Sequence, residues 1–225
     1  MKLETKNMIA VAEDYFETVE HLADKGTLVF HDVAWDDYED LLVKMESKPG
    51  HRVYYNDGVL KIMSPRYDHE KVKDLVFSIV RVYADELDLF VESAGSTTYR
   101  RRKKTKGAEP DTSFYLGDKA RKILGKATLD LEIDPPPDVV VEIDSTNESW
   151  DKFEIYAVFN VPEIWRFDGR RFAFYELVQK RYEERQTSFG FPLLTPQLLT
   201  DVLEQSQTNG QTAALKTFRR QIAKL

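Results

Sequence analysis

Residues 138–144, with the sequence Asp-Val-Val-Val-Glu-Ile-Asp, constrain the fold of this chain more than any other segment. An unbroken run of three valines suits a strand that is buried on both faces, and such a strand lies in the middle of a sheet. The run closes at Glu142, where a carboxylate is costly unless it is paired, solvated or bound to a metal. The alternative is that the strand emerges at the sheet edge there, and the residues alone leave both interpretations open.

The rest of the chain is patterned as helices and strands around that strand. Apolar residues at helical spacing predict helices, and Asp-Gly pairs between apolar runs predict two hairpins. The helices are expected at residues 35–42, 68–87, 149–160 and 196–203, and the strands at 52–55, 59–63, 89–92, 97–99, 111–116, 138–144, 163–167 and 171–177. Either Asn147 or Ser149 can cap the third helix. This order of elements predicts an α/β protein with a mixed β-sheet flanked by helices.

The composition bounds the class of protein. A chain of 225 residues can build one sizeable core, so we expect a single domain over 1–225, with an N-terminal extension at 1–30 and a polar C-terminal tail at 206–225. The absence of cysteine excludes disulfides and thiolate metal sites, and four scattered histidines disfavour a histidine-rich zinc site. No stretch reaches the roughly 18 apolar residues of a membrane span. We therefore expect a cytoplasmic protein without a membrane partner.

A local cluster of positive charge stands out in an acidic chain. The formal net charge of −7 argues against a protein that coats nucleic acid by bulk electrostatics, so such a contact needs a local basic patch. Residues 100–106, here called the basic segment, supply six cations: Arg100, Arg101, Arg102, Lys103, Lys104 and Lys106. A solvated loop is the usual explanation of such a run. The segment leads directly into Glu109-Pro110-Asp111, however, so a polyanion bound to it would lie beside the carboxylates.

Asp111, Glu142 and Lys152 are the candidate catalytic residues. Asp111 opens one predicted strand and Glu142 closes the next, and two carboxylates at the ends of neighbouring strands can hold a divalent metal. Lys152 falls in the first turn of a predicted helix, where the macrodipole disfavours a cation. Either the neighbouring acids offset this charge, or the lysine points back over the strand end to neutralise an oxyanion or orient a water.

Two further acids are additional candidates for the same site. Glu70 opens the long predicted helix, where the dipole favours an acid for structural reasons alone. Asp144 is either a further metal ligand or a cap for the loop that follows it.

Several segments together resemble the Uma-type family of restriction-endonuclease-like proteins, a branch of the PD-(D/E)XK nuclease superfamily. The resemblance runs from about residue 35 to residue 194, and its specificity comes from the combination of segments. The matching segments are 55–58 (Tyr-Asn-Asp-Gly), 63–65 (Met-Ser-Pro), 69–70 (His-Glu), 107–111 (Gly-Ala-Glu-Pro-Asp), 136–144 (Pro-Pro-Asp-Val-Val-Val-Glu-Ile-Asp), 152–156 (Lys-Phe-Glu-Ile-Tyr) and 161–165 (Val-Pro-Glu-Ile-Trp). The sequence departs from the family at Asn160, where a glycine is usual.

The resemblance implies a restriction-endonuclease-like core in which Asp111 and Glu142 bind the metal. Many members of the superfamily carry a lysine two residues after the glutamate, but here that residue is Asp144, so the lysine role falls to Lys152. The implied activity is hydrolysis of DNA by a Mg²⁺- or Mn²⁺-dependent endonuclease, with the Ile143 carbonyl as a further candidate ligand and Lys152 orienting the attacking water. The basic segment is similar to one in the family. A homodimer is expected, because many such cores pair to cut two strands.

Two other functions stay open on the sequence alone. A protein that keeps the nuclease fold without turnover would bind DNA in a regulatory role, independently of metal and with steep salt dependence. The presence of both acids and the lysine ranks this function second. A structural or oligomerisation protein would retain no DNA even at low salt, and the family resemblance ranks it last.

Overall fold

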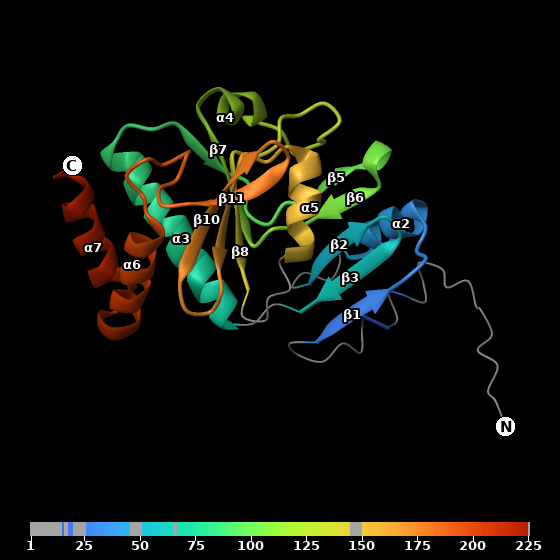
Figure 1. The fold of residues 1–225 in the computed structure, drawn as a ribbon, viewed down its shortest axis with the longest axis horizontal. Helices are drawn as coiled ribbons and strands as arrows, with labels where there is room; N and C mark the ends of the chain where they lie inside the picture. The colour runs from blue at the N-terminus through green and yellow to red at the C-terminus, as the bar shows by residue number, and fades with distance from the viewer. Residues whose placement is uncertain are drawn as a thin grey trace.

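The computed structural model describes residues 26–45, 51–64, 67–144 and 150–224, together with Tyr15, Thr18 and Val19. Within these residues the strands form two sheets (Figure 1). A six-stranded sheet has the order β11-β10-β9-β8-β7-β4, and a five-stranded sheet has the order β1-β3-β2-β6-β5. The chain thus has the α/β architecture and the mixed sheet that the sequence predicts.

The six-stranded sheet carries the valine-rich strand in its interior. Its strands are β4 (Val91–Ser93), β7 (Thr112–Leu116), β8 (Val139–Ile143), β9 (Glu163–Phe167), β10 (Phe172–Val178) and β11 (Arg181–Arg185). β8 pairs antiparallel with β7 and parallel with β9, and all five of its residues are buried. The prediction of a central strand is confirmed, and an edge position at Glu142 is excluded because both flanks of β8 are paired.

Helices cover both faces of this sheet. α3 (Tyr67–Glu86), α6 (Pro196–Asn209) and α7 (Gln211–Ile222) lie on one side, and α5 (Trp150–Phe159) lies on the other (Figure 1). Side chains alternate along a strand. Val139, Val141 and Ile143 accordingly join the core with α3, whereas Val140 joins the core with α5. The same alternation directs the Glu142 side chain toward α5, so the carboxylate contacts side chains of that helix.

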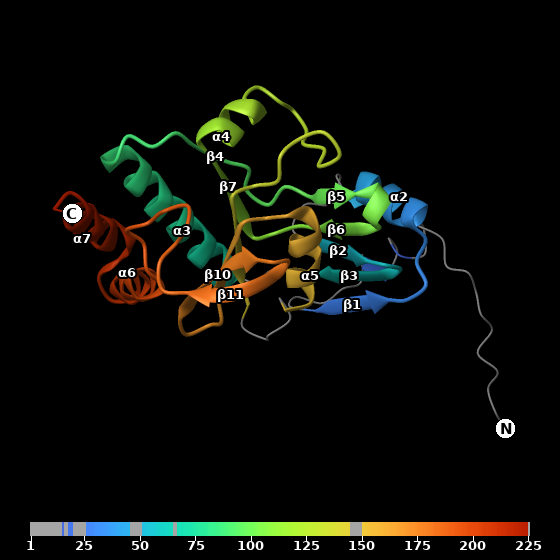
Figure 2. The same ribbon diagram turned by 45° about the horizontal axis from the view of Figure 1, so that its top comes forward.

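The five-stranded sheet stands beside α5. Its strands are β1 (Thr27–Phe30), β2 (Arg52–Asn56), β3 (Val59–Met63), β5 (Tyr99–Arg101) and β6 (Lys106–Ala108), and α2 (Trp35–Met45) packs on it through a separate core. α5 contacts both β6 and β11, so it lies between the two sheets (Figure 2).

Several boundaries differ from the sequence prediction. β4 and β5 are displaced by about two residues, and residues 102–104 form a single 3₁₀ turn. The sequence left residues 119–126 open between a helical turn and an insertion, and the short helix α4 (Gly117–Ile123) lies there. Three strands were not predicted: β11, which pairs with β10, β6, which pairs with β2 and β5, and β1, which pairs with β3 from within the expected extension. The expected helix caps Asn147 and Ser149 lie outside the described residues.

The C-terminal region contributes to the core. α6 continues to Asn209, and α7 (Gln211–Ile222) follows where the sequence predicts a polar tail, either unstructured or a loose helix. Ala214, Phe218 and Ile222 of α7 are buried in the same core as α3 and β8. Their spacing of four residues places them on one face of the helix, a pattern that the many polar residues between them obscure in the sequence. No helix in the described ranges combines the length and the apolar character that crossing a membrane requires.

The end of α5 explains one departure from the family pattern. Asn160 follows the last helical residue with φ of 58°, in the left-handed region. Glycine is the usual residue at such a helix end, and asparagine tolerates the same conformation better than most other residues. Asparagine can therefore replace the usual glycine here without changing the path of the chain.

Candidate active site

Asp111 is fixed at the point where the chain enters β7. Its backbone N–H donates to the Val141 carbonyl at 3.1 Å, which continues the β7–β8 ladder by one residue. Its Oδ2 accepts a hydrogen bond from the backbone N–H of Ile143 at 2.7 Å. The Asp111 carboxylate is therefore held against the β8 backbone, next to Glu142.

Glu142 meets two polar side chains of α5. Its Oε2 accepts from Lys152 Nζ at 2.5 Å, and its Oε1 accepts from the Tyr156 hydroxyl at 2.5 Å. Lys152 and Tyr156 are four residues apart and so share one face of the helix. Glu142 is 1% exposed, and both partners are buried. Asp111, Glu142 and Lys152, here called the carboxylate centre, are thus brought together as the sequence predicts.

The five-stranded sheet supplies a further contact to this centre. Lys152 Nζ donates to the Tyr54 hydroxyl of β2 at 2.7 Å and lies 3.9 Å from the centroid of its ring. The ammonium is therefore held by one carboxylate, one hydroxyl and one aromatic face. Sequence reasoning did not identify Tyr54 or Tyr156. The spacing from Lys152 could have indicated Tyr156, whereas nothing in the sequence places β2 beside α5.

An arginine and two more carboxylates border the Asp111 side of the centre. Arg52, the first residue of β2, has side-chain nitrogens 3.6 Å from Glu70, 3.8 Å from Glu109 and 4.0 Å from Asp111. Glu109 Oε2 also accepts from the Val53 backbone N–H at 3.2 Å. Glu70 is thus connected to the centre through Arg52, and it also pairs with Lys73. Arg52 and Glu109 were not among the predicted site residues.

Burial shifts the ionisation of these groups. It raises the pKa of Glu109 to about 7, against the opposing effect of the Arg52 guanidinium. Burial also raises the pKa of Glu142, although the Lys152 ammonium opposes the shift. For Lys152, burial lowers the pKa, but the nearby Glu142 and the other surrounding groups outweigh it, so the pKa is raised and the lysine is a cation at neutral pH.

The donors of the carboxylate centre fit a hard divalent cation. Among the described residues, no group of three or more histidines, aspartates and glutamates is arranged to hold a metal. Mg²⁺ is commonly bound by only one or two carboxylates, with water and substrate phosphate completing its coordination. Asp111 and Glu142 offer such oxygen donors, and each carboxylate oxygen keeps a second lone pair beside the hydrogen bond it accepts.

Asp144 has a different environment from the carboxylate centre. Its Oδ2 lies 3.1 Å from Arg166 Nη2, and both side chains are buried. A buried carboxylate and guanidinium compensate each other's charge. This ion pair to β9 accounts for the acid without a metal, so the role of Asp144 as a further ligand stays a prediction.

The basic segment is less open than a solvated loop. Arg101 donates to the backbone carbonyls of Leu131 and Val158, at 3.1 and 3.2 Å, and so ties β5 to α5. The acidic partners of the other cations are Asp36 and Glu39 for Arg102, Glu132 for Lys103 and Asp57 for Lys106. Within the described residues, Arg100 and Lys104 are exposed and form no ion pair.

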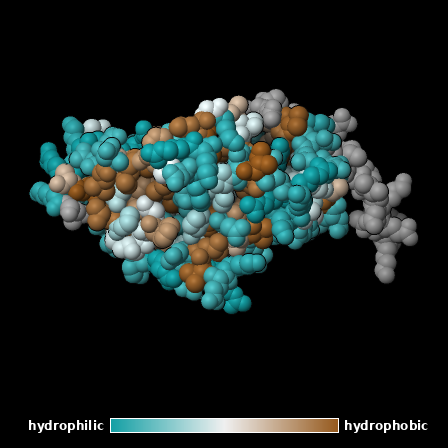
Figure 3. Space-filling view, turned by 90° about the horizontal axis from the view of Figure 1, so that it is seen from above, coloured by the Kyte–Doolittle hydropathy of each residue, from teal (hydrophilic) through white to brown (hydrophobic). Residues whose placement is uncertain are grey.

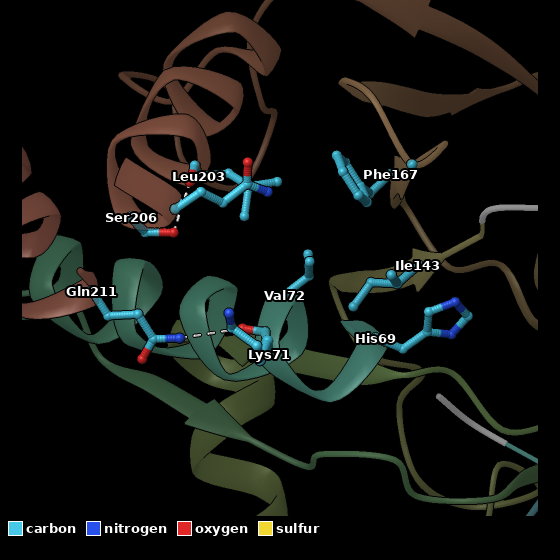
Figure 4. A pocket seen from close by; sticks show the side chains of 10 residues that line it. His69, Lys71, Val72, Ile143, Phe167, Leu203, Ser206 and Gln211 are labelled. Atoms are coloured by element: carbon cyan, nitrogen blue, oxygen red, sulfur yellow. Dashed lines mark hydrogen bonds between the residues drawn. The ribbon is translucent and has the colours of Figure 1, made fainter. Parts of the chain in front are cut away.

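A cavity of about 230 Å³ lies on the opposite face of β8 (Figure 4). Val72, Ile143, Phe167 and Leu203 form its apolar walls, and His69 stands at its edge. The cavity opens on the α3 side of the strand, whereas Glu142 faces α5. The Glu142 carboxylate and its partner Lys152 therefore lie on the α5 face of the strand, away from this cavity.

A mixed sheet with helices on both faces and two carboxylates at adjacent strand ends is an arrangement that fits a restriction-endonuclease-like protein. The chain belongs to the family described as "Uma2: Putative restriction endonuclease", whose model matches residues 35–209. Among solved structures, it is similar to the crystal structure of "a putative nuclease belonging to DUF820" from Anabaena variabilis ATCC 29413. The TM-score is 0.52 and the sequence identity 15%, over 75% of this chain and 98% of that chain. At that identity the likeness supports the fold. No curated protein matches the chain.

Proposed function

We propose that this protein is a metal-dependent endonuclease that hydrolyses DNA phosphodiester bonds. The observation that carries the proposal is the hydrogen bond from the Ile143 N–H to Asp111 Oδ2, because it places the aspartate beside Glu142 at the end of β8. Family membership supports a nuclease, and the buried Lys152 beside Glu142 supports a centre that handles negative charge.

Asp111 and Glu142 would hold Mg²⁺ or Mn²⁺, with the Ile143 carbonyl as a third candidate donor. When bound, a divalent cation supplies Lewis-acid stabilisation of phosphoryl oxygens and lowers the pKa of water. The residues of the chain have separate tasks. The Ile143 N–H orients Asp111, the Tyr156 hydroxyl orients Glu142, and Tyr54 and Glu142 hold the Lys152 ammonium. From that position Lys152 orients the attacking water and offsets charge on the phosphoryl oxygens.

The DNA partner is supported by the basic segment. Residues 106–108 form β6, and the chain then passes through Glu109 and Pro110 to Asp111, so the exposed Lys104 and Arg100 precede Asp111 by 7 and 11 residues. Arg100 and Lys104 are the cations best placed to attract a phosphate backbone, since the other four are engaged by protein groups.

The homodimer stays a prediction. The surface seen in Figure 3 is largely hydrophilic with interspersed hydrophobic patches. Among the residues that the structure describes, Val43, Ile133 and Phe189 are the most exposed large apolar residues, at 65%, 80% and 66%. They belong to α2, to the loop before β8 and to the loop before α6, respectively.

Cleavage of supercoiled plasmid tests the proposal. Wild-type protein with Mg²⁺ or Mn²⁺ is expected to nick or linearise the plasmid, and EDTA should stop the reaction. Asp111→Ala and Glu142→Ala should each abolish cleavage while the circular dichroism spectrum stays that of the wild type. Cleavage at the wild-type rate by either variant would exclude the proposed centre.

A second function is favoured by one specific observation. Both oxygens of Glu142 already accept strong hydrogen bonds from Lys152 and Tyr156, an arrangement that also suits a centre retained for stability alone. The protein would then bind DNA in a regulatory role without turnover. That function predicts DNA binding that is unchanged by EDTA, together with no cleavage by well-folded wild-type protein.

A further inference from the structure

Arg52 has an unusual set of partners for a buried arginine. Its side chain is only 9% exposed, and it faces the carboxylates of Glu70, Glu109 and Asp111. All three contacts, at 3.6 to 4.0 Å, exceed hydrogen-bond distance. Nε is buried and has no hydrogen-bond partner among the described residues. The guanidinium therefore lies near three carboxylates, while its buried Nε has no hydrogen-bond partner among the described residues.

An unsatisfied buried donor is costly, and a charged one is more so. The cost is explained if an acceptor absent from the protein itself completes the site. Guanidinium nitrogens form a planar fork that matches the oxygens of a phosphate, often in two parallel hydrogen bonds. The neighbouring carboxylates would keep the fork charged and oriented before such a ligand arrives.

An acceptor bound to Arg52 would lie beside the carboxylate centre. Arg52 Nε lies 4.0 Å from Asp111 Oδ1, and the other oxygen of the same carboxylate is bound by the Ile143 N–H. A phosphate oxygen that reached the guanidinium would therefore stand on the Asp111 side of the centre. The Lys152 ammonium lies beyond it, at Glu142.

We propose that Arg52 is a phosphate-binding residue that donates hydrogen bonds to a phosphodiester of the DNA at the carboxylate centre. This inference rests on the proposed function, since it takes its ligand from the DNA substrate. Arg52 belongs to β2, so the five-stranded sheet would take part in substrate binding as well as in the support that Tyr54 gives to Lys152.

Salt-dependent DNA binding tests this contact separately from cleavage. The affinity of a short fluorescein-labelled duplex is measured in EDTA over a range of salt concentrations, for the wild type, Arg52→Met and Arg52→Lys. Each phosphate contact contributes about 0.9 to the slope of log affinity against log salt. Arg52→Met is expected to make this negative slope shallower by about 0.9. Arg52→Lys should keep the wild-type slope because it keeps the charge.

Arg219→Met is the matched control for the loss of an arginine. Arg219 pairs with Glu86 at the C-terminal end of α3, whereas Glu70 lies near the N-terminal end of the same helix, roughly 24 Å away along its axis. This variant should keep the wild-type slope. Thermal unfolding of all variants identifies any that fail to fold. If Arg52→Met is one of them, the cleavage rate of Arg52→Lys carries the test instead.

Cleavage rates complete the test. Arg52→Lys should cut about 10- to 100-fold more slowly than the wild type, because an ammonium cannot reproduce the paired hydrogen bonds of the fork. A wild-type slope for Arg52→Met, with a wild-type rate for Arg52→Lys, would overturn the inference and leave the proposed nuclease intact. Failure of the wild type itself to cut would overturn the proposed function, while a lowered slope for Arg52→Met would still support the phosphate contact. A wild type that does not bind DNA overturns both.

Discussion

The carboxylate centre and the basic segment are both concentrations of charge, but the structure treats them in opposite ways. In the centre, Asp111, Glu142 and Lys152 are buried and each is held by a specific hydrogen bond. In the basic segment, four of the six cations are exposed, and three of the six pair with acids of other elements. Removing one partner of an ion pair is costly where water is excluded, because the other charge is left buried, and costs little at the surface. The two regions therefore differ in what a substitution should do.

The largest effect is expected for Lys152→Met, which leaves the Glu142 carboxylate buried without its cation. Breaking a buried ion pair by removing one partner costs about 3–5 kcal/mol. Urea unfolding should show this loss in the free energy of unfolding. Glu142→Gln combined with Lys152→Met should recover much of it, because neither charge then remains. A loss below about 1 kcal/mol for the single variant would show that the centre behaves like a surface pair.

A second buried carboxylate, that of Glu163, sharpens the comparison, because no cation of the described ranges forms an ion pair with it. Glu163 accepts hydrogen bonds from the Ser188 hydroxyl and from the backbone N–H groups of Phe189 and Gly190. Burial raises the pKa of Glu163 above its ordinary value of 4.5. The folded protein then binds more protons than the unfolded chain above pH 4.5, so this group's contribution to stability falls as pH rises through the folded pKa.

Glu163→Gln should remove that pH dependence. The wild-type free energy of unfolding, minus that of the variant, should fall by about 1.4 kcal/mol for each unit of pKa shift as the pH is raised from 4 to 8. Parallel urea titrations at several pH values measure the difference. If the difference rises with pH instead, the carboxylate is stabilised in its charged form and the assigned direction is wrong.

The exposed cations of the basic segment should affect DNA binding with little effect on stability. Arg100→Gln with Lys104→Gln should lower the salt slope of DNA affinity by up to about 1.8, since each phosphate contact contributes about 0.9. Arg102→Gln should lower it less, because Asp36 and Glu39 already hold this guanidinium. Equal decreases for Arg102 and the exposed pair would mean that the ion pairs of the segment open when DNA binds.

The smallest effect is expected for Arg102→Met, on the free energy of unfolding. Arg102 pairs with Asp36 and Glu39, but its side chain is 59% exposed. Exposed ion pairs contribute about 0–1 kcal/mol, so the free energy of unfolding should change by no more than that. A loss of several kcal/mol in urea unfolding would remove the distinction between the two regions.

Local patterns were sufficient for much of the fold. The Asp57-Gly58 turn, the apolar stripe of α3 and the valine run of β8 each depend on neighbours in the sequence, and each prediction is confirmed. The predictions that were incomplete concern elements stabilised by distant partners. β1 and β11 are formed by pairing with β3 and β10, and α7 is positioned by packing against α3.

The candidate site divides in the same way. Its first three members, Asp111, Glu142 and Lys152, were identified as a strand start, a strand end and a helix start, and the structure brings them together. Tyr54 and Arg52 could not be identified, because they come from the other sheet. The basic segment shows the converse limit. Its composition predicted a basic patch, whereas acids far away in the sequence pair with three of its six cations.

By itself, the sequence determined which residues form the central strand and which acids close or precede it, because burial and side-chain alternation are local consequences of residue type. Tertiary structure decided which groups those acids meet. The Glu142 side chain meets Lys152 and Tyr156 because α5 packs on that face of β8. Asp111 has Arg52 beside it because β2 pairs with β6, the strand that leads into Asp111. Hydrogen bonds and ion pairs act over a few ångströms, so only the packing of the two sheets around α5 could make these contacts.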